Sequence, residues 1–455
     1  MRKVGPYPNR PALLGGGARF GSVTPLPFFR DGLSETGPPM SAIANLSIYP
    51  SAPAIPPERD PRVPPNDVTG NPGHPLPVTI LGVTFDPLTL PDAVDRIEQM
   101  VDRRQPRYVV TPNVDFLVQA KHDAELHRVL ANADLVLCDG KPLVWASQWL
   151  GNTLPARVAG SDLTPLLLQR AEERGWRIFI LGGGAGVAAD AARRIAATHP
   201  FLPAIDYYSP PHGSLAEMNH EEIIRRVRVT KPDLVFVCFG CPKQEKWIFQ
   251  HYRALGVPVA IGLGGTVDFL AGRIRRAPGW MRRTGMEWLF RLLQEPRRLM
   301  RRYATNLLYF FPALVAQRLN LPPAASRKSK MPAAACAMTS YGLKVEAADQ
   351  FNHEGLRDAS DFWTRAVEQS GHCVLDLAAV KSIDSTGLAF LTHWQRRLAR
   401  ARRNLILFRP SLPVRTALAQ MRLTGQFVIN YGGSFGARFS GFGDQHLKVQ
   451  PGGDR

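Results

Sequence analysis

Polar residues at two places in the first half of the chain have the types and spacing that acid–base chemistry requires. Thr111 and Asn113 follow the apolar run Tyr108–Val110, and Asp139 follows the run Leu135–Cys138. In proteins of alternating strands and helices, the residues after parallel strands meet at the carboxyl edge of the sheet, where such proteins hold their sites. One carboxylate beside neutral hydrogen-bonding groups is typical of a general base. The pattern therefore indicates Asp139 as a base, with Thr111 and Asn113 orienting the substrate.

Each of these residues also has a structural interpretation. A helical pattern begins near Lys141 and another near Val114, so Asp139, Thr111 and Asn113 could instead cap helix N-termini. Asp162 fits the first turn of a helix better than a catalytic role. The sequence alone leaves these alternatives open.

Strand and helix patterns alternate over residues 76–272, which predicts an α/β domain. Its expected fold is Rossmann-like, with a mostly parallel sheet covered by helices on both faces. The candidate strands are short, apolar and rich in β-branched residues: Val78–Phe85, Tyr108–Val110, Leu135–Cys138, Ile178–Leu181, Ile205–Tyr208, Leu234–Phe239 and Val259–Leu263.

An arginine-rich helical appendage is expected over residues 273–320. The stretch from Arg273 to Tyr303 contains ten arginines, two glutamates and no lysine. Arginine binds phosphate oxygens in bidentate fashion, so this composition favours a diphosphate ligand. Tryptophan and leucine side chains are interleaved with the arginines, which is typical of a helix at a membrane interface. The net charge of +18 over 455 residues likewise fits an anionic partner such as an anionic membrane surface.

The spaced motifs of the chain, from about Pro77 to Leu319, resemble those of the WecG/TagA/CpsF family of glycosyltransferases. Two further motifs carry the resemblance, Gly240-Cys241-Pro242-Lys243-Gln244-Glu245 and the pattern Glu-Trp-Leu-x-Arg-Leu-x-x-Glu-Pro at residues 287–296. The resemblance implies that Asp139 is the catalytic base and that Thr111 and Asn113 are active-site residues. Matching positions imply substrate binding by Arg157, Gln244, Arg291, Arg298 and Arg301, and more weakly by Gly182 and Gly184. Arg157 and Gln244 could instead be ordinary loop or surface residues.

The reaction implied by this resemblance is transfer of a hexose or N-acetylhexosamine from a UDP-sugar to a polyprenyl-diphosphate-linked saccharide. It would be inverting, would need no metal or other cofactor, and would serve exopolysaccharide or cell-envelope glycan biosynthesis. No Asp-x-Asp stands at a strand end, so arginines are expected to take the place of a metal ion. No apolar run of ~18 residues and no secretory signal is visible, so a cytoplasmic protein, peripheral on the inner face of the cell membrane, is expected. The sequence does not identify the sugar.

A Rossmann-type NAD(P)-dependent oxidoreductase is the alternative for the first domain. The strand Ile178–Leu181 leads into a glycine-rich turn, and Asp206 follows about twenty residues later, as in a dinucleotide site. Three strands precede this unit, however, and no catalytic His/Lys set accompanies it. A nucleic-acid partner is not expected, because no recognition motif or aromatic platform is present.

A second, small α/β domain is predicted over residues 340–432. The strand Val374–Leu377, a polar turn and a helix starting at Asp384-Ser385-Thr386-Gly387 resemble the STAS domain. The resemblance implies a protein partner and makes Ser385 a possible phosphorylation site, where added charge would change docking. Asp384 and Ser385 could also merely cap the helix. A linker over 321–339 and disordered segments at 1–75 and 433–455 complete the expected organisation.

Overall fold

The structure, a computed structural model, describes residues 76–203, 205–284, 286–294, 296–321, 336–339, 342–347, 350–352, 356 and 372–432. All of these belong to one compact unit. The segments predicted to be disordered, 1–75 and 433–455, and most of the predicted linker lie outside the described residues.

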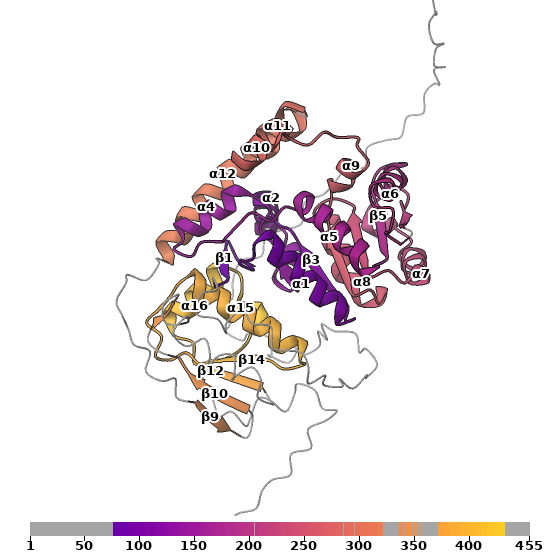
Figure 1. Cartoon of the computed structure of the whole chain (residues 1–455). Coiled ribbons are helices and arrows are strands. Elements are labelled where there is room, and N and C mark those ends of the chain that lie inside the picture. The colour runs from indigo at the N-terminus through magenta and orange to yellow at the C-terminus, as the bar shows by residue number, and fades with distance from the viewer. Residues whose placement is uncertain are drawn as a thin grey trace, which may run out of the picture. The chain divides into compact units, whose positions relative to one another are not determined.

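A six-stranded parallel sheet forms the centre of the first domain (Figure 1), which confirms the predicted α/β class. Its strand order is β4-β3-β8-β7-β5-β6. The bounds are β3 Arg107–Val110, β4 Leu135–Val136, β5 Ile178–Gly182, β6 Asp206–Tyr208, β7 Leu234–Cys238 and β8 Val259–Gly262. The first and last strands of the sheet along the chain, β3 and β8, are neighbours, so the loops that follow them emerge side by side at the carboxyl edge.

Helices pack on both faces of this sheet through two separate apolar cores. One face is covered by α1 Leu90–Asp102, α5 Gly160–Arg174, α6 Val187–Thr198 and α9 Thr266–Leu270. The other is covered by α2 Val114–His122, α3 Ala124–Ala131, α7 His220–Thr230 and α8 Lys243–Leu255. The strands read as continuous apolar runs because both of their faces are buried.

Local sequence signals fix where several helices begin and end. Thr89 and Asp92 form a capping box at the start of α1, so both backbone donors there have side-chain partners. Helices α5 and α8 end at Gly175 and Gly256, whose left-handed conformation suits glycine.

The prediction that Val78–Phe85 forms the first strand of the mostly parallel sheet is wrong. It is an antiparallel hairpin of β1 Val78–Ile80 and β2 Val83–Phe85. Leu81 and Gly82 form its turn with φ angles of 48° and 83°, the positive values that a tight two-residue hairpin requires. The turn lies inside an apolar run, so periodicity alone did not reveal it.

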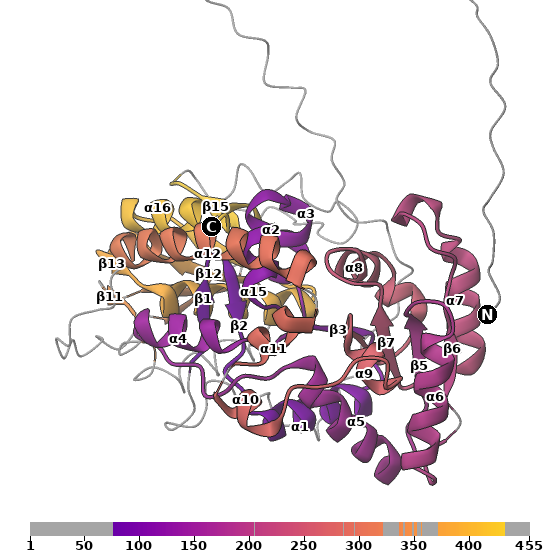
Figure 2. The ribbon, with the colours of Figure 1, turned by 90° about the horizontal axis from the view of Figure 1, so that it is seen from above.

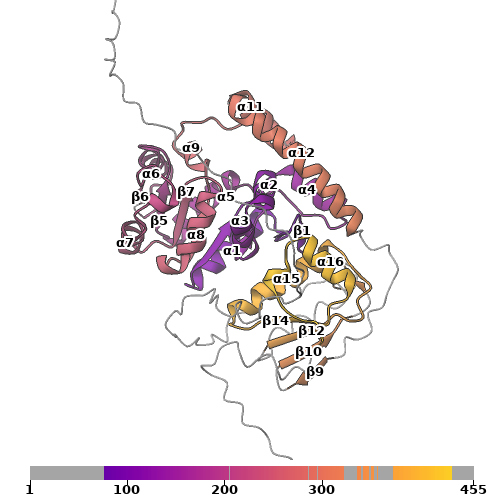
Figure 3. The ribbon, with the colours of Figure 1, turned by 180° about the vertical axis from the view of Figure 1, so that it is seen from behind.

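The arginine-rich appendage consists of α10 Gly279–Thr284, α11 Glu287–Gln294 and α12 Pro296–Asn320, with α12 running beside α2 and α4 Lys141–Trp149 (Figure 3). Phe310 and Leu314 on α12 are buried in the core of the domain. Leu308 and Phe311 of the same helix are 70% and 50% exposed. In the part of the chain that the structure describes, no helix is long and apolar enough to cross a membrane.

The second domain contains a five-stranded sheet in the order β15-β14-β12-β10-β9. Its strands are β9 Cys336–Thr339, β10 Gly342–Glu346, β12 His372–Asp376, β14 Leu405–Phe408 and β15 Val428–Asn430, and β11 Gln350–Phe351 pairs separately with β13 Ser382–Ile383. Only β9 is antiparallel to its neighbour. The domain also contains helices α15 Ser385–Arg400 and α16 Leu412–Gln420, which contribute to its apolar core.

Candidate active site

The loops after β3 and β4 bring Thr111, Asn113 and Asp139 together. The backbone N–H of Asp139 donates to the carbonyl of Pro112 at 3.1 Å, which ties the two loops to each other beyond the ends of the strands. A Cβ atom on Gly140 would lie 4.0 Å from the Cβ of Asn113. The predicted convergence at the sheet edge is therefore present.

The half-buried carboxyl of Asp139 does not cap the helix that follows it. Helix α4 takes Gly140 as its N-cap residue, and among the described residues no side chain caps it. Burial raises the pKa of Asp139 to about 6, although the positive charges of Arg157 and Arg291 act in the opposite direction. A carboxylate with this pKa is mostly ionised at neutral pH and is basic enough to accept a proton.

Asn113 does cap helix α2, as its structural interpretation predicted. Its side-chain oxygen accepts hydrogen bonds from the backbone N–H groups of Asp115 at 3.0 Å and Phe116 at 3.4 Å. Thr111 is 7% exposed and faces Gly160 at the start of α5, where a Cβ atom would lie 3.7 Å from its hydroxyl. The cap thus fixes the orientation of the Asn113 side chain, and Thr111 is buried near the start of α5.

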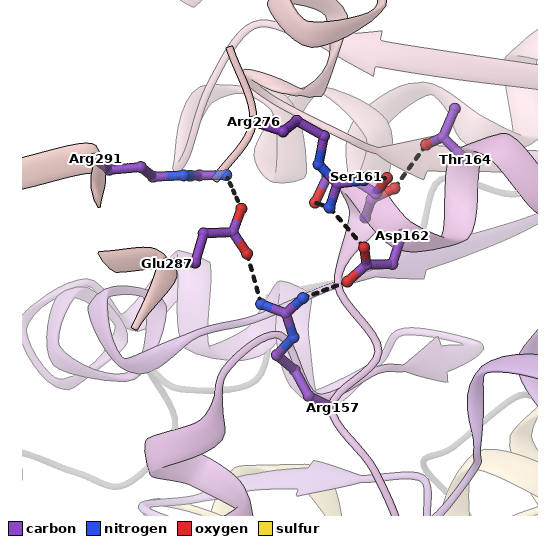
Figure 4. A network of polar contacts seen from close by, with 8 residues as sticks. Arg157, Ser161, Asp162, Thr164, Arg276, Glu287 and Arg291 are labelled. Atoms are coloured by element: carbon purple, nitrogen blue, oxygen red, sulfur yellow. Dashed lines mark hydrogen bonds and ion pairs between the residues drawn. The ribbon is translucent and has the colours of Figure 1, made fainter. Parts of the chain in front are cut away.

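A network of charged side chains adjoins this edge and joins the core to the appendage (Figure 4). The guanidinium of Arg157 lies between two carboxylates: it donates to Glu287 at 2.8 Å and also pairs with Asp162. Glu287 in turn accepts from Arg291 at 3.4 Å, one turn further along α11. Two of the arginines predicted to bind substrate therefore share one carboxylate.

Arg276, from the loop between α9 and α10, extends the network on the core side. It donates to Asp162 at 2.5 Å, to the hydroxyl of Ser161 at 3.1 Å and to the carbonyl of Ser161 at 3.0 Å. The ring of Phe269 lies 6.0 Å from the Arg276 guanidinium and 5.1 Å from that of Arg291. Of the arginines in this network, Arg157 and Arg291 lie close enough to Asp139 to lower its pKa.

Gln244, another predicted binding residue, is 2% exposed. Its side-chain oxygen accepts from the backbone N–H groups of Gly240 at 3.1 Å and Gly264 at 2.9 Å. Its amide donates to Glu245 at 2.5 Å. Glu245 is fully buried, and burial raises its pKa to about 7. Gln244 therefore holds the loops after β7 and β8 together at the edge.

The remaining predicted arginines lie on α12. Arg301 is exposed, and the side chain of Arg298 lies outside the described residues. Their neighbour Arg302 pairs with Asp115 at 2.6 Å, which joins α12 to the start of α2.

The glycine-rich turn does not form the dinucleotide site that the alternative reading required. Gly182 ends β5 with φ 104°, and a Cβ atom there would lie 2.8 Å from the carbonyl oxygen of Cys238; at Gly184 a Cβ would meet only Val187. Asp206 is paired in register with Phe179, three residues before Gly182. The acid of a dinucleotide site belongs at the carboxyl end of its strand, whereas Asp206 begins β6. The geometry therefore argues against the oxidoreductase.

Neither Glu287 nor Arg276 was predicted from the sequence to belong to the site. Asp162 was predicted only to lie in the first turn of a helix. Asp162 does lie in the first turn of α5, but it also holds two guanidiniums. The spacing of four residues between Glu287 and Arg291 was a local signal for their pairing. Nothing local pairs Arg157 with Glu287, which is 130 residues away. The predicted residue Ser385 belongs to the second domain, where it begins α15 and is 1% exposed.

At the carboxyl edge of a parallel α/β sheet, a carboxylate with a raised pKa thus lies beside clustered arginines. Residues 78–323 match the glycosyl transferase WecG/TagA/CpsF family, and residues 337–430 match the Mlab, STAS domain family. The chain therefore belongs to the WecG/TagA/CpsF family of glycosyltransferases.

Three curated relatives carry the name N-acetylglucosaminyldiphosphoundecaprenol N-acetyl-beta-D-mannosaminyltransferase. The protein of Bacillus spizizenii is 32% identical over 201 residues, which are 44% of this chain and 76% of the relative. That of Bacillus subtilis is 31% identical over 224 residues, 49% of this chain and 86% of the relative. A Staphylococcus aureus protein is 29% identical over 226 residues, 49% of this chain and 87% of the relative.

Proposed function

We propose that this glycosyltransferase moves a hexose or N-acetylhexosamine from a UDP-sugar to a polyprenyl-diphosphate-linked saccharide. The observation that carries the proposal is Asp139, a carboxylate with a pKa near 6 beside the paired arginines Arg157 and Arg291. The relatives' names specify a transferred N-acetylmannosaminyl group and an acceptor carried on diphosphoundecaprenol. Their similarity supports the same class of acceptor here, in exopolysaccharide or cell-envelope glycan assembly.

In the proposed reaction Asp139 removes the proton from the acceptor hydroxyl as its oxygen attacks the anomeric carbon of the donor sugar. The bond from that carbon to the diphosphate breaks, and UDP leaves with the electron pair. A single displacement of this kind inverts the configuration at the anomeric carbon. Thr111 and the amide of Asn113 orient sugar hydroxyls next to the base. Their fixed positions lower the entropic cost of reaching the transition state.

Arginines stabilise the departing diphosphate in this proposal. Preorganised cations aimed at developing charge are among the strongest sources of catalysis. Arg157 and Arg291 are already paired with carboxylates, so a diphosphate would exchange with Glu287 as their partner at little cost in ordering. The family resemblance assigns the same role to Arg298 and Arg301. Activity without a metal ion follows from this set of cations.

Attachment to the inner face of the cell membrane is proposed from the side chains of α4 and α12. Exposed on α12 are Leu307, Leu308, Tyr309, Phe311, Val315 and Leu319. Trp145 and Trp149 on the adjacent α4 are 58% and 46% exposed. A helix with one apolar face exposed, arginines nearby and the other face packed on the protein suits the headgroup region of an anionic leaflet.

The direct test is a transfer assay with the full-length protein, a panel of UDP-sugars and polyprenyl-diphosphate-N-acetylglucosamine, run with and without EDTA. We expect one or a few UDP-sugars to release UDP and lengthen the acceptor, at equal rates in both conditions. Loss of activity in EDTA with recovery on adding Mg²⁺ would contradict the role given to the arginines. Turnover of NAD(H) without any sugar transfer would contradict the function itself.

A further inference from the structure

Ser385, where regulatory members of the STAS class would carry a phosphoryl group, is covered by the transferase domain. It is the first residue of α15, behind the N-cap Asp384. The side-chain amide of Gln317, on α12, donates to the Ser385 hydroxyl at 2.9 Å. The serine is 1% exposed, so the end of the helix that sequence reasoning assigned to a partner is already occupied.

Gln317 forms hydrogen bonds with the β1–β2 hairpin as well as with Ser385. Its side-chain oxygen accepts from the backbone N–H of Leu81 at 2.8 Å, and its amide donates to the carbonyl of Thr79 at 2.7 Å. It is 1% exposed. A phosphoryl group on Ser385 would introduce acceptor oxygens and negative charge beside a backbone carbonyl, in a space with no water access. Such a group and the observed contact exclude each other.

Arg396, three turns further along α15, anchors the other end of the contact. Its guanidinium donates to the carbonyls of Ala131 at 2.6 Å, Leu130 at 3.4 Å and Thr84 at 3.4 Å, and the residue is 7% exposed. Leu130 and Ala131 end helix α3, so the cation satisfies carbonyls that lack helical partners and lies at the negative end of the helix dipole. Arg396 therefore binds the transferase domain through the positions of its backbone carbonyls.

Two carboxylates continue the contact toward the strands that carry the active-site loops. Arg400 binds Asp134 at 2.9 Å through Nε, and Asp134 accepts from the backbone N–H of Tyr108 on β3 at 3.1 Å. The ring of His393 lies 3.6 Å from Asp86, whose carboxylate accepts from the N–H of Val136 on β4 at 2.8 Å.

The hairpin turn fits the second domain closely. A Cβ atom on Gly82 would lie 2.4 Å from the carbonyl oxygen of Met421, just after α16. Leu76 and Leu321, which flank the transferase domain in sequence, are buried in the core of the second domain. Figure 2 shows α15 beside β1 and β2.

We infer that the Ser385 face of α15 is a docking surface whose partner is the transferase core of the same chain, and that modification of Ser385 and docking are mutually exclusive. The STAS domain then acts in cis, holding the β1–β2 hairpin and the starts of β3 and β4. Ser385 becomes reachable by a modifying enzyme, or by another protein, only after the domain has been released. This inference does not depend on which sugar the transferase uses.

Hydrogen–deuterium exchange on the full-length protein tests it. We expect Arg396→Ala to speed exchange in peptides covering residues 78–85 and 130–136 by about tenfold or more, because a buried guanidinium that serves three carbonyls is lost. Ser385→Glu should do the same to the hairpin. Ser382→Glu, at an exposed serine three residues earlier, and Arg415→Ala, at an exposed arginine on α16, should leave both peptides unchanged.

Peptides covering β12 and β14 report in the same experiment whether the STAS domain of each variant is folded. Gln317→Ala provides the reciprocal test, since it alters the transferase side alone and should speed exchange at the start of α15. Hairpin exchange that is the same in the wild type, Arg396→Ala and Ser385→Glu, with β12 and β14 protected in all three, would overturn the inference. So would efficient phosphorylation of Ser385 that leaves hairpin protection intact.

Discussion

Two parts of the chain, the helical appendage and the STAS domain, pack on the α/β core, and they use arginine in different ways. The appendage meets the core near Asp139 through arginine–carboxylate pairs, and the Arg291 side chain there is 45% exposed. The STAS domain meets it through Arg396, which is 7% exposed and binds backbone carbonyls. The pairs of Arg291 are ionic and partly open, whereas the contacts of Arg396 are buried and made to backbone carbonyls.

Under the proposed function, this difference separates an arginine that is able to bind the donor diphosphate from one that is not. A carboxylate partner such as Glu287 can give way to a phosphate, which offers the guanidinium similar oxygens and more charge. Backbone carbonyls fixed by the end of a helix cannot move aside, so Arg396 is bound to its place for as long as the domains are docked. Charge counted along the sequence does not distinguish the two, whereas the type of partner does.

The largest effect is expected from Asp139→Asn, which removes the proton acceptor and changes the volume very little. Turnover should fall by ~10²-fold or more while UDP binding survives. The measurements are kcat in the transfer assay and UDP affinity by calorimetry. A near-wild-type rate would rule out the base, and parallel loss of binding and turnover would indicate a structural role.

Glu287→Gln should act on the ionic contact through the arginines. It removes the charge that gathers Arg157 and Arg291, so we expect kcat/KM for the UDP-sugar to fall about tenfold, close to the cost of one charge-assisted hydrogen bond. Asp190→Asn is the matched control, because Asp190 also binds the arginine-rich segment, through Arg273, but is not among the charges that shift the pKa of Asp139. Equal losses in the two variants would mean that Glu287 serves only to attach the appendage.

The pH dependence of kcat/KM should show the shifted pKa of Asp139. The base must be deprotonated, so activity should be constant above about pH 7 and fall up to tenfold per unit below about pH 6. The negative charge of Glu287 raises the pKa of Asp139. Glu287→Gln should therefore move the acid limb to lower pH, and a limb that stays in place or moves upward would contradict this coupling.

The fold was predictable because most strands are buried on both faces and stand out as apolar runs between helical patterns. The hairpin of β1 and β2 was not predicted, because its turn residues Leu81 and Gly82 lie inside an apolar run and periodicity does not mark the turn. The convergence of Thr111, Asn113 and Asp139 followed from parallel topology alone.

The ionic network did not follow from that topology, since Arg157 and Glu287 lie 130 residues apart in the sequence and on different elements. The burial of Ser385 was equally hidden, because its partner Gln317 lies 68 residues earlier. Contacts between residues so distant in sequence depend on how whole elements pack, which a local pattern does not encode.

The smallest effect concerns the exposed apolar face of α12. Leu308→Ser should weaken binding of the full-length protein to anionic vesicles about fivefold, since one 70%-exposed leucine would transfer part of its surface into the headgroup region. Val229→Ser is the control, because Val229 is also 70% exposed but lies on α7. Cosedimentation at low and high salt measures both variants. Because arginine contributions are screened within a Debye length while apolar insertion is not, the loss from Leu308→Ser should persist at high salt. If the two variants bind alike, the α12 face does not enter the membrane, and the appendage serves the diphosphate alone.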